Sequence, residues 1–240
     1  MIPAYFKGKL VVEDNHIKTN EDFKTSCSIG LLQYLPDAIF KEIIQECCRI
    51  KEDFGQIQAF NFWEHTDVSF TSNERFVEPD VWIETDNYDV IIEAKFDDNA
   101  GQYKDQWKKE IQSIRNEQSN RNIHKKIVLV ALGGNNTLHD EKIEETPIYK
   151  MSWLNLLTAI VNKRQEYGSD THICRLLDDI ISLFALQGIM KVQWLDSLQV
   201  VKSLYTDSIQ HRITPSNVGF IASKELFINK IAIKKWRPVN

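Results

Sequence analysis

Residues 78–96, EPDVWIETDNYDVIIEAKF, contain two short apolar runs separated by a polar turn. The first run follows a proline and Asp80, and the second ends with Glu93, an alanine and Lys95. Apolar runs of this length, broken at residues 85–87 by threonine, aspartate and asparagine, predict two strands joined as a hairpin. The sequence therefore places three charged side chains at the ends of strands that are otherwise built to be buried.

The expected hairpin brings these charged residues together. Side chains on a strand alternate between the two faces, so Glu93 and Lys95 share one face and Ala94 points to the other. In a hairpin, the start of the first strand pairs with the end of the second, which places Asp80 beside Glu93 and Lys95. Alternative interpretations are a plain turn residue at Asp80 and a surface ion pair between Glu93 and Lys95. The apolar stretch 90–92 argues against an exposed edge strand.

The chemistry of this cluster favours a metal ion. Two adjacent carboxylates repel each other unless one is protonated or a cation lies between them. Mg²⁺ binds through one or two carboxylates and keeps several waters. A bound metal makes water more acidic, and a neighbouring lysine can stabilise negative charge on phosphorus. The cluster therefore contains the groups needed for metal-assisted hydrolysis of a phosphodiester.

The rest of the chain predicts an α/β domain. Asn20 is a good N-cap, and apolar residues then recur at helical spacing as far as Pro36. The further expected elements are a helix around residues 39–47, strands at 57–63, 81–84 and 88–96, a polar helix from 99 or 100 to 119, strands at 126–132 and 147–150, a helix capped by Ser152, a helix at 172–187, a helix around 195–205 and two edge strands within 219–233. This order predicts a central mixed β-sheet flanked by helices.

Composition points to an ordinary globular protein in the cytoplasm. The chain has 240 residues and a mass of 28.0 kDa, with 42% hydrophobic and 26% charged residues. No apolar run approaches the roughly 18 residues of a membrane span, and no secretory signal is visible, so we expect no membrane association. The four cysteines form no C-x-x-C pair and are expected to stay reduced in the core.

Charge is distributed unevenly along the chain. The net charge is −5, but residues 201–240 carry seven Lys/Arg against two Asp/Glu, a local charge of +5. Such a segment could contact a phosphate backbone, or it could be a solvated tail. Trp194 and Trp236 could belong to a partner surface or to the core.

Residue spacing argues against two other classes of site. The six histidines are dispersed, with no H-E-x-x-H or H-x-H pattern, which argues against a zinc site. Gly133-Gly134 follows an apolar strand but lacks the lysine and hydroxyl of a phosphate-binding loop, which excludes a P-loop NTPase.

The pair Pro79-Asp80 followed by Glu93-Ala94-Lys95 resembles the PD-(D/E)xK nuclease superfamily, which has the restriction-endonuclease-like fold. The acidic helix opening at residues 20–22 and the glutamine-bearing helix after the second strand are similar to the surroundings of that motif. The strand-to-helix step into Met151-Ser152-Trp153-Leu154 is also similar. The resemblance covers roughly residues 20–165. It implies a nuclease-like domain at residues 1–190 and a helical, basic extension at 191–240 for dimerisation or DNA contact.

The resemblance implies roles for individual residues. It makes Asp80 and Glu93 metal ligands, together with the backbone carbonyl of Ala94, and it makes Lys95 the catalytic lysine. The ion would be Mg²⁺, with Mn²⁺ as a substitute. Glu21 would face the site from the first helix, or it serves only as a favourable first-turn acid. Gln106 or Gln102 would orient the site or touch DNA. Glu64, at the end of the first strand, is a further candidate carboxylate.

The function that the resemblance implies is metal-dependent cleavage of DNA, in restriction or phage defence. A homodimer and a partner protein of a defence system are the assemblies it suggests. One alternative is a catalytically silent or partner-dependent nucleic-acid-binding or regulatory module of the same fold. Another is a Mg²⁺-dependent hydrolase of a different phosphate ester.

Overall fold

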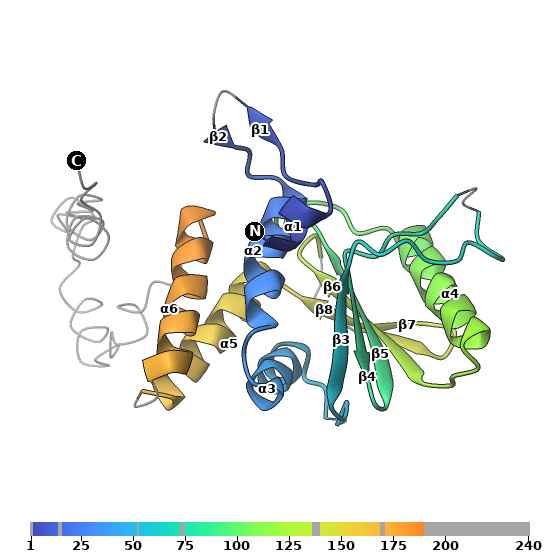
Figure 1. Ribbon diagram of the computed structural model, residues 1–240. Helices are drawn as coiled ribbons and strands as arrows, with labels where there is room; N and C mark the ends of the chain where they lie inside the picture. Colours follow the sequence, from blue (N-terminus) through green and yellow to red (C-terminus); the bar gives the residue numbers. More distant parts are fainter. Residues whose placement is uncertain are drawn as a thin grey trace, which may run out of the picture. The chain divides into compact units, whose positions relative to one another are not determined.

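The structure, a computed structural model (Figure 1), describes residues 2–13, 16–51, 53–72, 75–135, 140–168 and 171–189. The helix expected at 195–205, the strands expected within 219–233, Trp194, Trp236 and the basic extension at 191–240 lie outside these residues. Within them, no helix is both long and apolar enough to cross a membrane.

Six helices and eight strands make up the described part of the chain. The helices are α1 (Ile2–Phe6), α2 (Glu21–Leu32), α3 (Asp37–Cys48), α4 (Lys104–Asn120), α5 (Trp153–Glu166) and α6 (Thr171–Leu186). The strands are β1 (Val12–Glu13), β2 (His16–Ile17), β3 (Ile57–Phe62), β4 (Val81–Thr85), β5 (Tyr88–Ala94), β6 (Lys126–Leu132), β7 (Glu141–Ile143) and β8 (Thr146–Met151).

A six-stranded mixed sheet forms the centre, in the order β3-β4-β5-β6-β8-β7. Strands β5, β6 and β8 are parallel, while β3, β4 and β5 are antiparallel neighbours and β7 pairs antiparallel with β8. The expected α/β class with a mixed sheet and flanking helices is confirmed. The continuous apolar run of β6 is explained by its central position, with both faces covered.

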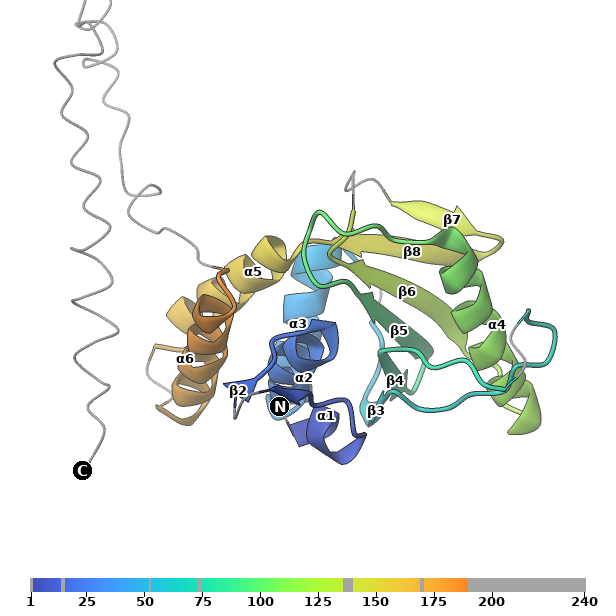
Figure 2. The same ribbon diagram turned by 90° about the horizontal axis from the view of Figure 1, so that it is seen from above.

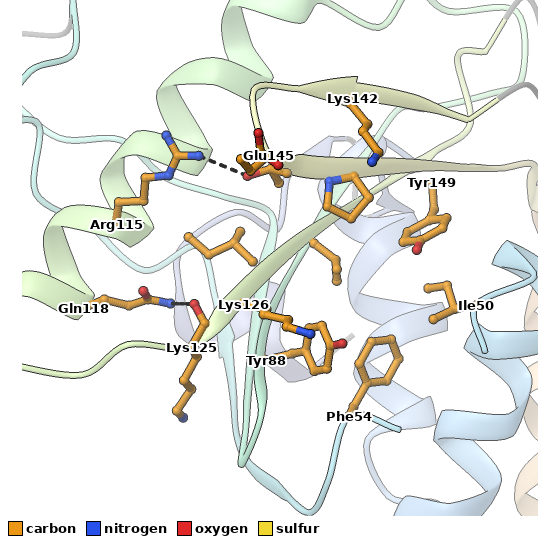
Figure 3. Close-up of a pocket in the computed structure, with 14 residues that line it drawn as sticks. Ile50, Phe54, Tyr88, Arg115, Gln118, Lys125, Lys126, Lys142, Glu145 and Tyr149 are labelled. Carbon is orange, nitrogen blue, oxygen red and sulfur yellow. Dashed lines mark hydrogen bonds between the residues drawn. The ribbon is translucent and has the colours of Figure 1, made fainter. Parts of the chain in front are cut away.

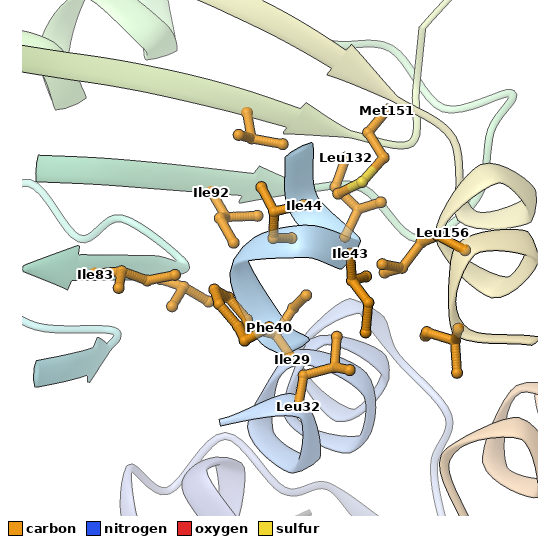
Figure 4. Packing of buried hydrophobic residues seen from close by; sticks show 14 of the residues in the cluster. Ile29, Leu32, Phe40, Ile43, Ile44, Ile83, Ile92, Leu132, Met151 and Leu156 are labelled. Atoms are coloured by element: carbon orange, nitrogen blue, oxygen red, sulfur yellow. The ribbon is translucent and has the colours of Figure 1, made fainter. Parts of the chain in front are cut away.

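The two faces of the sheet carry separate cores. Helices α2, α3, α5 and α6 cover one face, and α4 covers the other (Figure 2). On the first face, Ile43 and Ile44 of α3 are directed toward Ile92 and Leu132 of the sheet (Figure 4). On the second face, Trp107 of α4 packs in a smaller cluster that is also fully apolar. Alternation along β5 therefore assigns even residues to the larger core and odd residues to the side of α4.

The polar helix starts later than the sequence predicted. It was expected from residue 99 or 100, whereas α4 begins at Lys104. The carboxylate of Asp97 accepts hydrogen bonds from the amides of Asn99 and Ala100, both at 2.8 Å. The Gln102 amide then donates to the carbonyl of Gly134 at 3.2 Å. These bonds hold residues 97–102 as a loop between β5 and α4.

Three small elements and the cysteines complete the comparison. The pair β1–β2 and the helix α1 were not predicted, and neither was the three-residue edge strand β7.

The four cysteines are free thiols; Cys27, Cys48 and Cys174 are buried, and Cys47 is half-buried. Burial raises the pKa of Cys47 to about 12, which keeps this thiol protonated.

Candidate metal centre

Asp80 is fixed immediately before β4 by two N–H groups. The indole Nε1 of Trp63 donates to its Oδ1 at 3.0 Å, and the amide of Ala94 donates to its Oδ2 at 2.8 Å. The register pairs Val81 with Ile92, which places Asp80 next to Glu93 as the hairpin predicts. Burial raises the pKa of Asp80 well above its usual value, and repulsion from Glu93 adds to this.

Glu93 is the deepest of the predicted acids. It is 1% exposed and lies on the α4 side of β5. Its Oε1 accepts hydrogen bonds from Lys95 and from Nε2 of Gln106, the latter at 2.7 Å. Burial raises its pKa well above the usual range, and the neighbouring carboxyl of Glu110 raises it further. Glu93 therefore needs positive charge or a proton beside it.

Lys95 supplies part of that charge. It follows β5 directly, donates to Glu93 and lies 3.8 Å from Oε1 of Glu21. Burial acts to lower the pKa of Lys95, but Glu93, Glu21 and Asp80 together raise it above its ordinary value. Its ammonium group is therefore charged at neutral pH.

Glu21 reaches the same cluster from another element. It is the first residue of α2, where a negative charge is favourable at the helix N-terminus. Asn20 caps this helix by accepting a hydrogen bond from the Phe23 amide at 2.8 Å, as the sequence predicted. Burial raises the pKa of Glu21, and the charge of Lys95 opposes this.

The three carboxylates fit a divalent cation. Glu21, Asp80 and Glu93 each offer one oxygen, and these oxygens lie within 4.8 Å of one another. Three acids face the ammonium of Lys95, so negative charge is in excess, and burial raises the pKa of each acid. Hard oxygen donors with surplus negative charge are the ligands that Mg²⁺ and Mn²⁺ prefer. The amide of Ala94 donates a hydrogen bond to Asp80. The role of the Ala94 carbonyl as a metal ligand stays a prediction.

The two candidate glutamines have different contacts. Gln106, in the first turn of α4, binds the carboxylate of Glu93. The sequence placed Gln102 in the same helix, but Gln102 precedes α4, which begins at Lys104. Its Nε2 donates to the backbone carbonyls of Glu93 at 3.2 Å and Gly133 at 3.1 Å, and its Oε1 accepts from the indole of Trp107 at 2.9 Å. Gln106 therefore orients the site, whereas Gln102 fastens the ends of β5 and β6.

The chain after Lys95 is held by a tryptophan and a buried lysine. The indole of Trp153 donates to the carbonyl of Lys95 at 2.7 Å. Lys24 of α2 donates to the carbonyl of Phe96, and its Nζ lies 4.4 Å from the ring centroid of Trp153. Burial lowers the pKa of Lys24, while Asp98 and Asp97 oppose this. These contacts fix the backbone from which the Lys95 side chain extends.

The first of the two glycines that follow β6, Gly133, is required by its conformation and its close neighbours. It has φ +71°, and a Cβ there would lie 2.7 Å from Nε1 of Trp153 and 3.0 Å from the carbonyl of Lys95. A side chain would therefore push apart the contact that holds Lys95.

Sequence reasoning missed two residues of the site. Glu110 lies one turn after Gln106, is 1% exposed, and its Oε2 has no hydrogen-bond partner among the described residues. Burial raises its pKa to about 8. Its position four residues after Gln106 was the available signal. Trp63, which carries no signal of a site role in the sequence, donates to Asp80 and adopts a left-handed φ of +47°.

Glu64 does not join the cluster. Its side chain is 49% exposed and pairs with Lys7 at 2.6 Å. Among the described residues, the acids gathered at the site are thus Glu21, Asp80 and Glu93, with Glu110 behind them.

Comparisons with known proteins add little to this geometry. No family model matches the chain, and no solved structure matches it. The chain is similar to an uncharacterized protein of Pasteurella multocida (strain Pm70), with 28% identity over 236 residues that cover 90% of this chain and 86% of the relative. This similarity therefore assigns no activity to the chain.

Proposed function

We propose that this chain is a metal-dependent nuclease that hydrolyses phosphodiester bonds in DNA. The observation that carries the proposal is the gathering of one oxygen each from Glu21, Asp80 and Glu93 within 4.8 Å, with Lys95 against them. A restriction-endonuclease-like core is part of the proposal. It is supported by the order of the β4–β5 hairpin, α4, the parallel strand β6 and then β8.

The residues have distinct tasks in this proposal. Asp80 and Glu93 would hold the ion, with Glu21 and the Ala94 carbonyl as further ligands. A bound Mg²⁺ would supply Lewis-acid polarisation and a more acidic water. Gln106 keeps the carboxylate of Glu93 oriented through its 2.7 Å hydrogen bond. Lys95 donates to a phosphoryl oxygen and stabilises the negative charge that develops on it.

The resemblance, not the geometry, supplies the choice of DNA, of a defence role and of a homodimer. The geometry favours a phosphodiester in general, because a cationic donor adjoins a set of hard oxygen ligands.

The deciding experiment is a cleavage assay with four proteins. Supercoiled plasmid and a single-stranded oligonucleotide are incubated with Mg²⁺, Mn²⁺ or EDTA and the wild type, Asp80→Ala, Lys95→Ala or Lys108→Ala. Lys108 is a control because its side chain is 59% exposed on α4. We expect metal-dependent cutting by the wild type and the control, and a loss of roughly 100-fold or more in the other two variants. Circular dichroism checks that each variant folds.

Other outcomes support the alternatives. DNA binding without cutting in either metal supports a silent or partner-dependent module. Hydrolysis of p-nitrophenyl phosphate in preference to DNA, again dependent on Lys95, supports a hydrolase of another phosphate ester.

A further inference from the structure

A cleft lies at the opposite end of the parallel strands from the candidate metal centre. It has a volume of about 490 Å³ and is lined by the first residues of β5, β6 and β8, among others. Glu93 and Lys95 lie at the other end of β5. The cleft therefore shares strands with the metal centre but none of its predicted residues.

Pro147 accounts for the opening of this cleft. Strands β6 and β8 are paired from Leu129 and Ile148 onward, whereas β5 already pairs with β6 at Lys126. Proline has no N–H to donate, so Pro147 cannot extend the ladder toward β6. The first residues of β6 therefore lie beyond its ladder with β8, and the cleft opens there.

The lining is strongly basic although the whole chain is acidic. Four cations (Arg115, Lys125, Lys126, Lys142) contribute to it against one acid, Glu145, whereas the net charge of the chain is −5; of these cations, Arg115 is paired with Glu144. Lys125 donates to the carbonyl of Thr85 at 2.6 Å. Lys126 and Lys142 are exposed residues at the start of β6 and in β7. These two lysines are placed to meet an anion at the mouth of the cleft.

Three aromatic residues contribute to the lining, Phe54, Tyr88 and Tyr149. Figure 3 shows Phe54, Tyr88 and Tyr149 on one side of the cleft and Arg115 and Gln118 of α4 on the other. Phe54 and Tyr88 form an edge-to-face pair with ring centroids 5.2 Å apart, and they are nearly buried. Tyr149 is half-buried and lines the cleft. Aromatic surfaces beside cations suit a planar base that carries phosphate.

We propose that this cleft binds a nucleotide, with its base against Tyr149 and its phosphates toward Lys126 and Lys142. A volume of about 490 Å³ lies within the range of sites for small ligands. The proposal is independent of the nuclease activity, because the ligand is recognised by residues that the metal centre does not use.

Binding is measured by isothermal titration calorimetry in EDTA, with ATP, adenosine and inorganic triphosphate as probes. We expect saturable binding of ATP and binding at least tenfold weaker for adenosine and for triphosphate. Lys142→Glu and Tyr149→Ala should each weaken ATP binding at least tenfold. Tyr149→Phe keeps the ring and should stay within threefold of the wild type. Lys108→Glu, an equal charge change at an exposed lysine of α4, should stay within twofold.

An oligonucleotide separates the two sources of this ligand. If a single-stranded octanucleotide binds more tightly than ATP and is weakened by Lys142→Glu, the site takes a nucleotide from a strand. If ATP binds more tightly, it takes the free nucleotide. Absence of saturable ATP binding, equal binding of triphosphate, equal loss in Lys108→Glu, or loss in Asp80→Ala would each overturn the proposal.

Discussion

Asp80 and Glu110 are both buried, but their carboxyl groups differ in hydrogen bonding. Both oxygens of Asp80 accept hydrogen bonds from rigid N–H donors, which fixes the group for coordination. Glu110 has one oxygen without a partner among the described residues. A buried acid in that state is most stable with its proton, as the raised pKa of Glu110 indicates. Asp80 is therefore suited to hold an ion, whereas Glu110 is suited to keep its proton.

The contact between Trp63 and Asp80 can be tested with an internal control. Trp63→Phe removes the donor to Oδ1 of Asp80, and Trp82→Phe removes an equivalent 3.0 Å hydrogen bond to the buried Asp89. Each variant should lose about 1–3 kcal/mol of unfolding free energy in urea, because an acceptor loses its partner. Only Trp63→Phe should also weaken Mg²⁺ binding in a thermal-shift titration. Equal Mg²⁺ affinity in both variants would assign Trp63 to packing alone.

The protonation of Glu110 predicts a pH dependence of stability. Its pKa is raised from 4.5 to about 8 in the folded chain, so from pH 4.5 to 8 the unfolded chain releases a proton that the folded chain keeps. Stability from this group is present below pH 4.5 and is lost as the pH rises through 8. Glu110→Gln should therefore gain on the order of 2 kcal/mol over the wild type at pH 8.5 and little at pH 4.5.

Urea unfolding in EDTA at these two pH values measures the effect of Glu110→Gln. The control is Glu166→Gln, at a side chain that is 55% exposed. A gain of equal size at both pH values would contradict the assignment, because it would not depend on ionisation.

At the scale of elements, local signals were sufficient wherever a segment is strongly periodic or capped. Asn20 and Ser152 both cap their helices as predicted, and the apolar run of β6 is a central strand. Strand β7 was missed because three residues at an edge show no alternation and exist only by pairing with β8. The start of α4 was misplaced because the loop before it bonds to Gly134, at the end of β6, through Asp97 and Gln102.

The site was predictable as far as one hairpin could define it. Asp80, Glu93 and Lys95 follow from the register of two adjacent strands. Glu110 carries a weaker signal, its position four residues after Gln106, and a glutamate within a polar helix normally faces solvent. Its burial depends on how α4 packs across the sheet, which the local sequence does not determine.

The junction between β6 and α5 gives a prediction about a glycine. Gly133→Ala would place a Cβ 2.7 Å from Nε1 of Trp153, whereas Gly8→Ala, at a similar φ of +67°, has no atom within 4 Å. Both variants share the cost of a left-handed alanine, roughly 1 kcal/mol. Gly133→Ala should lose at least about 1–3 kcal/mol more in urea unfolding and should reduce cleavage, because Lys95 shifts. Equal losses in the two variants would show that Trp153 adjusts freely.

At the scale of the whole sheet, the two ends of the parallel strands differ in charge. Three acids lie where β5 ends, and four cations line the cleft where β5 and β6 begin. The strand residues between the two ends are apolar, and Ile91 and Leu129 among them are fully buried. This separation lets each end bind its own ligand without sharing a side chain, so variants at one end can serve as controls for the other.

The acidic end predicts that Mg²⁺ stabilises the fold most at alkaline pH. The pKa values of Asp80 and Glu93 are raised, so without metal their contribution to stability is present at low pH and is lost as the pH rises through the raised values. Mg²⁺ binds the ionised carboxylates and reverses this loss. At a concentration of 100 Kd it should add about 2.7 kcal/mol, a rise in Tm of roughly 5–10 °C. Calorimetric scans from pH 5 to 9, in Mg²⁺ or in EDTA with KCl at equal ionic strength, measure it, and a rise that persists in Glu93→Gln would place the ion elsewhere.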